Sequence, residues 1–339
     1  MAPSTIPAPP KKNVTRRSRK TTANLVLYSI NINGMNSKFD SFIRILSILS
    51  PDIITICELK TSQLSLLRVK LKEQNYKMMI QPQSGMAIVA KQKLEMVNVT
   101  ACDHPNILSA SFTYQDIRIR LIAVYGLQEN ADATERENFY DELNIEIEHC
   151  TVSDENPLIS GDLNAKLGKE NVGVCALSPN GKLLLEAVNK YNLKVLNFSD
   201  KCNGKWTRTR MKNDVLEESV LDYVITNNCL VSKLESITID ESKTYTPFRT
   251  SKDKQTYSDH NAIISKFTWK RNKSYEKTTT PQIGKLGWKI NSEGLQMFKE
   301  KTSDTTLEAP TTYNHLESIL DKTMNECFSM KKPKSNKEV

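Results

Sequence analysis

Polar side chains suited to acid–base and metal chemistry stand at the ends of several apolar runs in this 339-residue chain. They are Asn31, Glu58, Tyr125, Asp162, Asn164, Ser258, Asp259 and His260. A side chain at a strand end is held by a rigid sheet and still reaches solvent, so functional residues collect there. The set offers carboxylates, amides, a phenol and an imidazole, and this inventory suits phosphoester hydrolysis.

Hydrolysis of a phosphodiester needs a positioned water, a group that takes its proton, and donors around the developing negative charge. Mg²⁺ prefers a few carboxylate oxygens and keeps positions for water and phosphate. Glu58, at the end of a buried run, fits such a ligand, and Asp162 and Asn164 are expected to face the same side. Each position alone also fits an ordinary strand end or an Asx turn. Their concentration in one segment favours a site.

The segments that would position these residues mix strand and helix patterns. Alternation or compact apolar runs predict strands at 25–32, 52–57, 77–81, 86–90, 94–99, 107–114, 117–125, 157–163 and 193–198. Helical spacing of apolar residues predicts helices at 39–49 and around 62–74, 135–149 and 180–190. Neighbouring strands recur with short turns, so we expect two packed sheets flanked by helices and no purely parallel sheet.

The net charge of +8 is unevenly distributed along the chain. Residues 1–23 hold six bases and no acid, and residues 271–339 hold twelve bases and nine acids. The middle, 24–270, has 29 bases and 30 acids, so its net charge is −1. We therefore expect a basic disordered tail (1–23), a single large domain (24–270), and a polar linker followed by an amphipathic helix at 312–329. The tail fits a nuclear-localisation or nucleic-acid patch as well as a plain solubilising segment.

Several classes of protein are disfavoured by composition. The seven cysteines are odd in number and widely spaced, which indicates neither a disulfide framework nor a zinc site. No apolar run reaches the roughly 18 residues of a membrane span, and the N-terminus lacks the apolar core of a secretory signal. We expect an intracellular protein, nuclear or cytoplasmic, that does not associate with membranes. Its oligomeric state has no sequence signal.

Seven motifs together resemble the endonuclease/exonuclease/phosphatase superfamily, with its deoxyribonuclease-I-like nucleases and abasic-site endonucleases. They are SININGMNS (29–37), ITICELKTS (54–62), AVYG (123–126), ISGDLNAKLG (159–168), KWTRTR (205–210), SVLDYVI (219–225) and YSDHNAI (257–263). Within the superfamily, the chain is most similar to the apurinic-type endonuclease domain of non-LTR (LINE-type) retrotransposons. The likeness covers about residues 24–270.

The resemblance implies a four-layered α/β sandwich with the site at one edge of two mixed sheets. It implies Mg²⁺, with Mn²⁺ as a substitute, held by Glu58, while Asp259 contributes to the metal site or orients it. By the same resemblance Asn31 and Asn164 position the phosphate or the waters of the metal, and Tyr125 donates to a phosphate oxygen. Asp222 orients His260, and Asp162 activates the water or protonates the leaving group. The choice of general base between Asp162 and the Asp222–His260 pair stays open, as does one metal or two.

Three positions depart from the pattern of the abasic-site enzymes. Asn33 occupies a place where those enzymes commonly have Asp, so one metal ligand is lost. Gly126 follows Tyr125 where the family usually has Pro, and Cys57 precedes Glu58 where it usually has Gln. We expect these changes to affect loop geometry more than the reacting groups.

Two segments are expected to contact double-stranded DNA. Residues 206–223 are predicted to form a hairpin with a turn at 212–214, and retrotransposon nucleases use such a hairpin in a DNA groove. The DNA-binding residues predicted there and near it are Lys205, Thr207, Arg208, Arg210, Lys212, Arg249 and Ser258. The loop 243–257 adds Lys243, Lys252 and Lys254, with Tyr245 and Phe248 able to stack or wedge. Edge-protecting charge is the alternative explanation for the hairpin.

The sequence thus predicts a Mg²⁺-dependent DNA endonuclease that nicks one strand to leave a 3′-hydroxyl and a 5′-phosphate. In a retrotransposon that 3′-hydroxyl would prime reverse transcription of the element RNA, by a reverse-transcriptase part that these residues do not include. We therefore expect a piece of a longer polyprotein. Two alternatives stay open: another superfamily phosphodiesterase, such as an abasic-site repair endonuclease, and a catalytically idle DNA-binding protein derived from a retroelement.

Overall fold

The computed structural model of the chain describes residues 22–102, 104–168, 176–251, 254–269, 288–289, 296–297 and 329–330. Two units divide the chain, Met1–Arg271 and Asn272–Val339. In the second unit β18 (Trp288–Lys289) pairs antiparallel with β19 (Ser329–Met330). The tail predicted at 1–23, the linker after 270 and the helix predicted at 312–329 lie outside the described residues, except for residues 22, 23 and 329.

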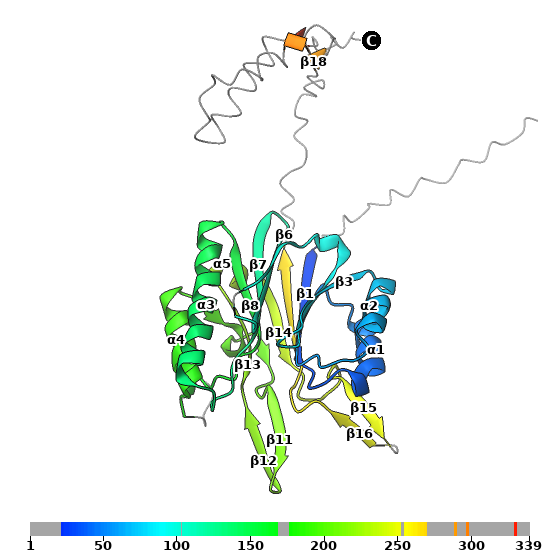
Figure 1. Cartoon of the computed structure of the whole chain (residues 1–339), viewed down its shortest axis with the longest axis vertical. Coiled ribbons are helices and arrows are strands. Elements are labelled where there is room, and N and C mark those ends of the chain that lie inside the picture. Colours follow the sequence, from blue (N-terminus) through cyan, green and yellow to red (C-terminus); the bar gives the residue numbers. More distant parts are fainter. Residues whose placement is uncertain are drawn as a thin grey trace, which may run out of the picture. The chain divides into compact units, whose positions relative to one another are not determined.

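Two large sheets form the body of the first unit (Figure 1). One sheet has the order β10-β14-β17-β1-β2-β4-β3, and the other has the order β5-β6-β7-β8-β13-β9. The first comprises β1 (Ala23–Asn31), β2 (Ile53–Cys57), β3 (Tyr76–Gln81), β4 (Met86–Lys91), β10 (Cys202–Asn203), β14 (Leu234–Ile239) and β17 (Ile263–Trp269). The second comprises β5 (Val97–Ala101), β6 (Ile107–Tyr114), β7 (Ile117–Tyr125), β8 (Asn156–Asp162), β9 (Lys194–Val195) and β13 (Asp222–Thr226).

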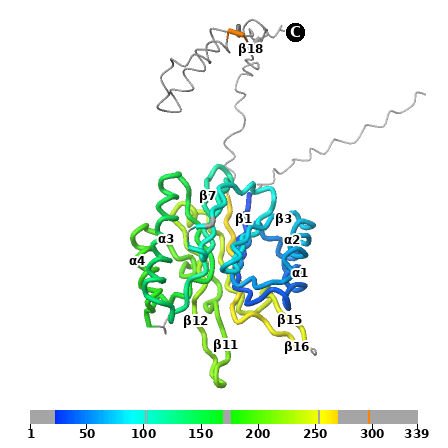
Figure 2. Tube along the Cα trace, in the orientation of Figure 1, coloured from blue at the N-terminus to red at the C-terminus, as the bar shows by residue number. Residues whose placement is uncertain are grey.

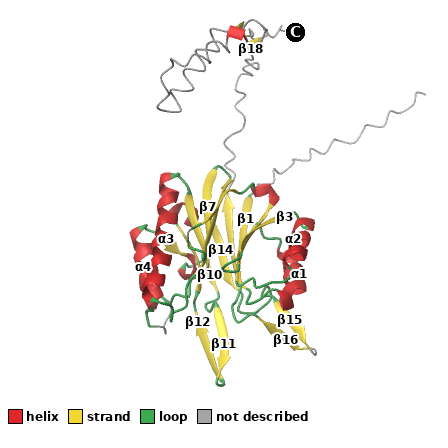
Figure 3. Ribbon diagram, viewed as in Figure 1, coloured by secondary structure: helices red, strands yellow, loops and turns green. Residues whose placement is uncertain are grey.

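Helices cover the outer face of each sheet, as Figure 3 shows. On one side lie α1 (Phe39–Leu49) and α2 (Leu64–Glu73), and on the other lie α3 (Ala133–Val152) and α4 (Pro179–Lys190). The short α5 (Asn228–Val231) follows β13. Helix, sheet, sheet and helix make four layers, and the trace in Figure 2 follows them from one side to the other. The predicted four-layered sandwich is confirmed.

Strand alternation sorts apolar side chains into three cores. Leu25 and Leu27 of β1 face the layer between the sheets, where they meet the inner side chains of the second sheet. Tyr28 and Ile30, one residue out of phase, pack under α1 and α2. A third core joins α3 and α4 to the second sheet. Because side chains alternate along a strand, β1 serves two cores at once and is buried on both faces.

Caps set the helix starts on the far side. Asp132 accepts a hydrogen bond from the Thr134 amide at 2.8 Å and begins α3. Ser178 accepts one from the Gly181 amide at 3.1 Å, with Pro179 in the first turn of α4. Such caps satisfy backbone donors that have no partner within the helix.

Three predicted strand segments differ from the structure by three or more residues at one end. The strand predicted at 94–99 is β5 at 97–101, because residues 92–94 form a 3₁₀ turn that buries Leu94. The strand predicted at 193–198 is reduced to β9, since 196–198 also form a 3₁₀ turn. The hairpin predicted at 206–223 ends at 219: β11 (Arg208–Lys212) pairs with β12 (Val215–Ser219), and Asp222 already belongs to β13.

Among the described residues, no helix is both long enough and apolar enough to cross a membrane.

Candidate active site

Strand pairing brings four predicted site residues to one edge of the sandwich. In the first sheet β1 runs parallel to β2, so Asn31 at the end of β1 pairs with Cys57, one residue before Glu58. In the second sheet β7 runs parallel to β8, so Tyr125 pairs with Asp162. The carboxyl ends of parallel strands share an edge, and here both sheets present that edge to the same pocket.

The second sheet also supplies the partner of the histidine. Asp222, at the start of β13, is directly opposite Asp162 in the antiparallel register with β8. His260 lies in the loop before β17 and forms an isolated bridge with Arg208 of β11. Asp162 and Asp222 are 2% and 3% exposed, and His260 is 5% exposed. Three ionisable side chains are therefore almost fully buried together.

Asn31 links the two sheets through its amide. Its Nδ2 donates to Oε1 of Glu58 at 3.1 Å and to Oδ2 of Asp162 at 2.9 Å. Its Oδ1 accepts from the Asn33 amide at 3.0 Å, which fixes the orientation of the side chain. Asn31 is 1% exposed, so both of its donors are committed to the two carboxylates. The distance between those carboxylates is set by a single side chain.

Glu58 lies in the left-handed region, with φ of 53°, at the point where β2 ends. Tyr125 donates to its Oε1 at 2.8 Å, and Lys60 forms an ion pair with its Oε2 at 2.5 Å. Burial acts to raise the pKa of Glu58, but the hydrogen bonds from Lys60, Asn31 and Tyr125 outweigh it and lower that pKa. The carboxylate is consequently charged at neutral pH, and it reaches the pocket with 15% of its side chain exposed.

Asp222 holds His260 through Nδ1, which lies 2.8 Å from Oδ2 of the carboxylate. The other ring nitrogen, Nε2, lies 3.8 Å from Oδ2 of Asp162. Burial favours neutral His260, but the charges of Asp222 and Asp162 outweigh it and raise its pKa to about 9. Burial and then the charge of Asp222 raise the pKa of Asp162 to about 7. At neutral pH the imidazole of His260 therefore keeps its proton, whereas Asp162 gains and loses one.

Asp259 stands at the mouth of the site and is less buried. Arg208 Nε lies 2.9 Å from its Oδ2, and Asn33 Nδ2 lies 3.3 Å from its Oδ1. Burial opposes ionisation of Asp259, but His260 and Arg208 outweigh it and lower its pKa. Asn33, at the place where abasic-site enzymes commonly have Asp, therefore donates a hydrogen bond to the carboxylate of Asp259.

These side chains line an open pocket of about 930 Å³. Its wall includes Glu58, Tyr125, Asp162, Asn164, Asp259 and His260. Asn164 lies two residues after the end of β8 with φ of 46°. Its amide N–H donates to Asp162 at 2.9 Å, and its side chain donates to the Gly126 carbonyl at 2.8 Å. Gly126 is required there, since a Cβ would lie 2.2 Å from the Leu163 carbonyl oxygen.

The donor set fits a hard divalent cation. Glu58 and Asp259 offer ionised carboxylate oxygens at the rim of a water-accessible pocket, which is the ligand chemistry that Mg²⁺ prefers. A second group, Asp162, Asp222 and His260, has ligand atoms within 4.8 Å of one another. Asp222 already hydrogen-bonds the imidazole, and all three side chains of this group are almost fully buried. The greater exposure of Glu58 on the pocket wall favours it as the metal ligand over the buried group.

Two residues predicted to contact DNA are internal. Thr207 is fully buried, and its hydroxyl accepts from the Leu221 and Asp222 amides at 2.9 and 3.0 Å. Ser258 is 3% exposed and donates to the Asn31 carbonyl at 2.8 Å. Both hydroxyls therefore fix the backbone beside Asp222 and Asn31, and their burial is at odds with the predicted contact with DNA.

Two lysines near the site were not among the predicted site residues. Lys60 pairs with Glu58, and only its spacing of two residues from Glu58 could have signalled this. Lys38 is 7% exposed and donates to the carbonyls of Ile32 and Asn33 at 2.9 and 2.8 Å, beneath the loop that carries Asn33. A buried lysine that binds backbone carbonyls has no sequence pattern of its own.

Residues 28–260 match the model of the Endonuclease/Exonuclease/phosphatase family, and the chain belongs to that family. It is therefore an enzyme of a superfamily of metal-dependent nucleases and phosphodiesterases. No significant match to a curated protein was found.

Three of the solved structures that share this fold are nucleases. A 3′-5′ exonuclease (NExo) from Neisseria meningitidis matches with a TM-score of 0.59 and 15% identity, covering 72% of this chain and 100% of that one. The endonuclease domain of TRAS1, a telomere-specific non-LTR retrotransposon, matches at 0.53 and 14%, covering 72% and 98%. An AP endonuclease from Archaeoglobus fulgidus matches at 0.57 and 14%, covering 72% and 99%. At these identities the likeness shows the shared fold.

Proposed function

We propose that this protein is a Mg²⁺-dependent DNA endonuclease that nicks one strand of a duplex and leaves a 3′-hydroxyl and a 5′-phosphate. The observation that carries this proposal is that three side chains in one open pocket differ in their protonation at neutral pH. Glu58 is ionised, His260 holds its proton, and Asp162 titrates near neutrality. Hydrolysis of a phosphodiester uses one group of each kind.

Glu58 is the principal metal ligand in this proposal, and Asp259 and Asn31 complete or orient the site. When bound, Mg²⁺ polarises the phosphate and lowers the pKa of a coordinated water, and Mn²⁺ can take its place. Tyr125 and Asn31 hold the Glu58 carboxylate in one orientation through hydrogen bonds of 2.8 and 3.1 Å. A carboxylate held in this way needs little reorganisation to receive a cation.

Asp162 is the residue that takes the proton of the attacking water. Its raised pKa gives it affinity for that proton, and hydrogen bonds from Asn31 and the Asn164 amide fix both carboxylate oxygens. His260, protonated and oriented by Asp222, offers Nε2–H to a non-bridging phosphate oxygen. Because His260 holds its proton near neutral pH, it acts as donor and leaves the role of base to Asp162. Asn164 lies on the pocket wall, where its side chain positions the phosphate.

The substrate class is double-stranded DNA. The structural likeness to a retrotransposon endonuclease domain supports target-site nicking, in which the new 3′-hydroxyl primes reverse transcription of element RNA. That RNA would be engaged by a reverse-transcriptase part outside these residues. A protein that nicks chromosomal target sites in this way would act in the nucleus.

An abasic-site repair endonuclease is the second candidate, and the likeness to an AP endonuclease fold supports it. Asn33 in the place of a common Asp of the repair enzymes favours the first proposal. The third candidate is a protein that binds DNA and has lost its catalytic activity. The intact set of Glu58, Asp162, Asp222 and His260 disfavours it.

Cleavage of two end-labelled duplexes separates these candidates. One duplex is undamaged and the other contains a single abasic site, and both are incubated with Mg²⁺. The first proposal predicts cleavage of both duplexes, reduced at least about 100-fold by Glu58→Ala and by His260→Ala. Cleavage confined to the abasic duplex supports the repair enzyme, and binding without cleavage of either duplex supports the idle protein.

A further inference from the structure

Two hairpins leave the sandwich beside the active site (Figure 1). One is β11–β12, and the other is β15 (Phe248–Ser251) paired with β16 (Lys254–Tyr257). Both are tied to Asp259: the Thr209 amide of β11 donates to the Asp259 carbonyl at 2.8 Å, and β16 ends two residues before Asp259. Figure 3 shows both projecting from the same edge of the sandwich. A duplex with its phosphate in the pocket would pass near both.

The cations of the β11–β12 hairpin are already paired. Oε2 of Glu217 lies 2.6 Å from Nε of Arg210, and its Oε1 lies 3.6 Å from Nζ of Lys212. Arg208 forms an ion pair with Asp259. Between residues 208 and 219 the sequence has three basic and three acidic side chains. This hairpin therefore has no net charge, and its cations are less free to bind the DNA phosphates that they are predicted to contact.

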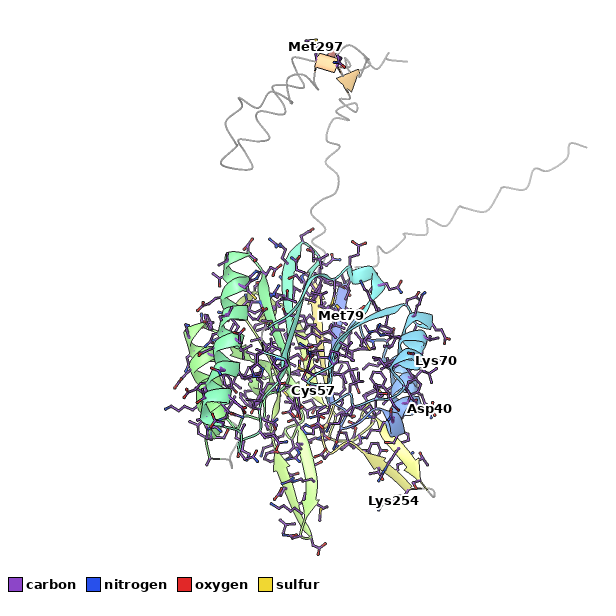
Figure 4. All side chains as sticks on the ribbon, viewed as in Figure 1. Asp40, Cys57, Lys70, Met79, Lys254 and Met297 are labelled. Carbon is purple, nitrogen blue, oxygen red and sulfur yellow. The ribbon has the colours of Figure 1, made fainter. Side chains whose placement is uncertain are left out.

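The β15–β16 hairpin differs in charge and in pairing. Residues 248–257 include three bases and one acid. Arg249 and Lys254 are exposed, and neither forms an ion pair with a residue that the structure describes. In the register Arg249 is opposite Thr256 and Lys254 is opposite Ser251, so both cations lie on one face. Lys254 extends into solvent at the far end of the hairpin (Figure 4).

The opposite face anchors this hairpin to the body. Phe248 and Tyr257 are half-buried and contact each other with ring centroids 5.3 Å apart. The backbone of Phe248 also exchanges two hydrogen bonds with the Ser41 hydroxyl of α1, at 2.7 and 2.9 Å. Phe248 thus packs against its own hairpin, and the prediction that it wedges into DNA is replaced by an anchoring role. Lys243 is half-buried and donates to the carbonyls of Ser258 and His260.

We infer that the β15–β16 hairpin is the arm that binds the phosphates of the duplex beside the cleavage site, while Glu217 holds the β11–β12 hairpin neutral. This inference rests on the proposed function. An unpaired cation that meets a phosphate releases a counterion from DNA at no cost to the protein. Arg210 and Lys212 must first leave Glu217, so they contribute less to binding.

The test is the salt dependence of duplex binding in EDTA, which stops cleavage. The wild type is compared with Arg249→Ala/Lys254→Ala, with Arg210→Ala/Lys212→Ala as a control that also removes two cations, and with Glu217→Gln. We expect the first variant to reduce the slope of log affinity against log salt by about 2, and the control by less than 1. Glu217→Gln should increase the slope, because it releases Arg210 and Lys212. Thermal unfolding of each variant establishes that it is folded.

An unchanged slope for Arg249→Ala/Lys254→Ala would overturn the inference, as would a larger loss for the control pair. Nicking by the wild type is measured separately on the same duplex with Mg²⁺. Nicking together with equal slopes rejects the arm and keeps the endonuclease. The expected slopes without nicking reject the endonuclease and keep the arm.

Discussion

Oδ2 of Asp162 lies 3.8 Å from Nε2 of His260, and both side chains are almost wholly buried. Burial of Asp162 raises its pKa to about 7, and the neighbouring carboxylates raise that of His260 to about 9. Adjacent ionisable groups with strongly displaced pKa values are typical of an acid and a base with separate roles. The relationship depends on the register of β8 with β13, which sets Asp162 opposite Asp222.

The rate of nicking should follow a bell-shaped curve in pH. It rises through about pH 7 as Asp162 loses its proton, and it falls through about pH 9 as His260 loses its own. Asp222→Asn should move the alkaline limb to lower pH, since Asp222 is the main group that raises the pKa of His260. Initial rates on plasmid at saturating Mg²⁺ measure both limbs. Asp141→Asn, on the exposed face of α3, should leave the curve in place.

Stability of the metal-free protein should also depend on His260. Because its pKa is higher in the folded state, protonated His260 stabilises the fold fully below about pH 6.5, and this contribution is lost as pH rises to about 9. Thermal unfolding in EDTA between pH 6 and 9 should show a larger fall in Tm for the wild type than for His260→Gln. Parallel curves for the two proteins would contradict the shift. His149→Gln, at an exposed position, is the matched control.

Lys60 should compete with the metal for Glu58. The ammonium lies 2.5 Å from Oε2, with Lys60 63% and Glu58 15% exposed, so the pair is open to exchange. Exposed ion pairs contribute about 0.2–1 kcal/mol, and Lys60→Met should therefore tighten Mn²⁺ binding by roughly 2- to 5-fold. Glu58→Gln should weaken it at least about 10-fold.

Calorimetric titration of Mn²⁺ without DNA measures these affinities. Lys70→Met removes a lysine from the comparable Lys70–Glu73 pair on α2 and should have no effect. Weaker Mn²⁺ binding by Lys60→Met would mean that Lys60 supports the metal site and does not compete for it.

Gly161 should be the least replaceable residue beside Asp162. Its φ is 149°, and a Cβ would lie 2.0 Å from the Val124 carbonyl oxygen of β7. Gly161→Ala therefore has to separate two paired strands, and it should lower the free energy of unfolding by about 3 kcal/mol or more. Gly34→Ala, where a Cβ meets no atom within 4 Å, should cost about 1–2 kcal/mol through its φ of 89° alone. Urea unfolding distinguishes the two, and equal losses would contradict the close approach of β7 and β8.

Much of this architecture was predictable because its strands are long and apolar. The strands at 107–114 and 117–125 were predicted to the residue, since β-branched runs bounded by a turn identify them. The residue types of Asn31, Glu58, Asp162 and His260 at strand ends predicted one shared site. The bounds of short elements were predicted less well. The strand β9 has only two residues, and a 3₁₀ turn replaces the rest of its predicted length.

Pairing between distant segments could not be read from sequence. Arg208 and Asp259 are 51 positions apart, and Asn33 and Asp259 are 226 apart. The sequence shows that residues 208–219 carry as many acids as bases, but only the cross-strand register shows that Glu217 pairs with Arg210. Burial likewise decides that Thr207 supports the site from inside.

The most direct test of the central claim is conversion of supercoiled plasmid by the purified protein in Mg²⁺. We predict open circles that DNA ligase reseals without any other treatment, because the nick carries a 3′-hydroxyl and a 5′-phosphate. The Glu58→Ala and His260→Ala variants, once thermal unfolding has shown that they are folded, should leave the plasmid supercoiled. Tight binding of plasmid by the wild type with no open circles at any concentration of Mg²⁺ or Mn²⁺ would contradict the claim.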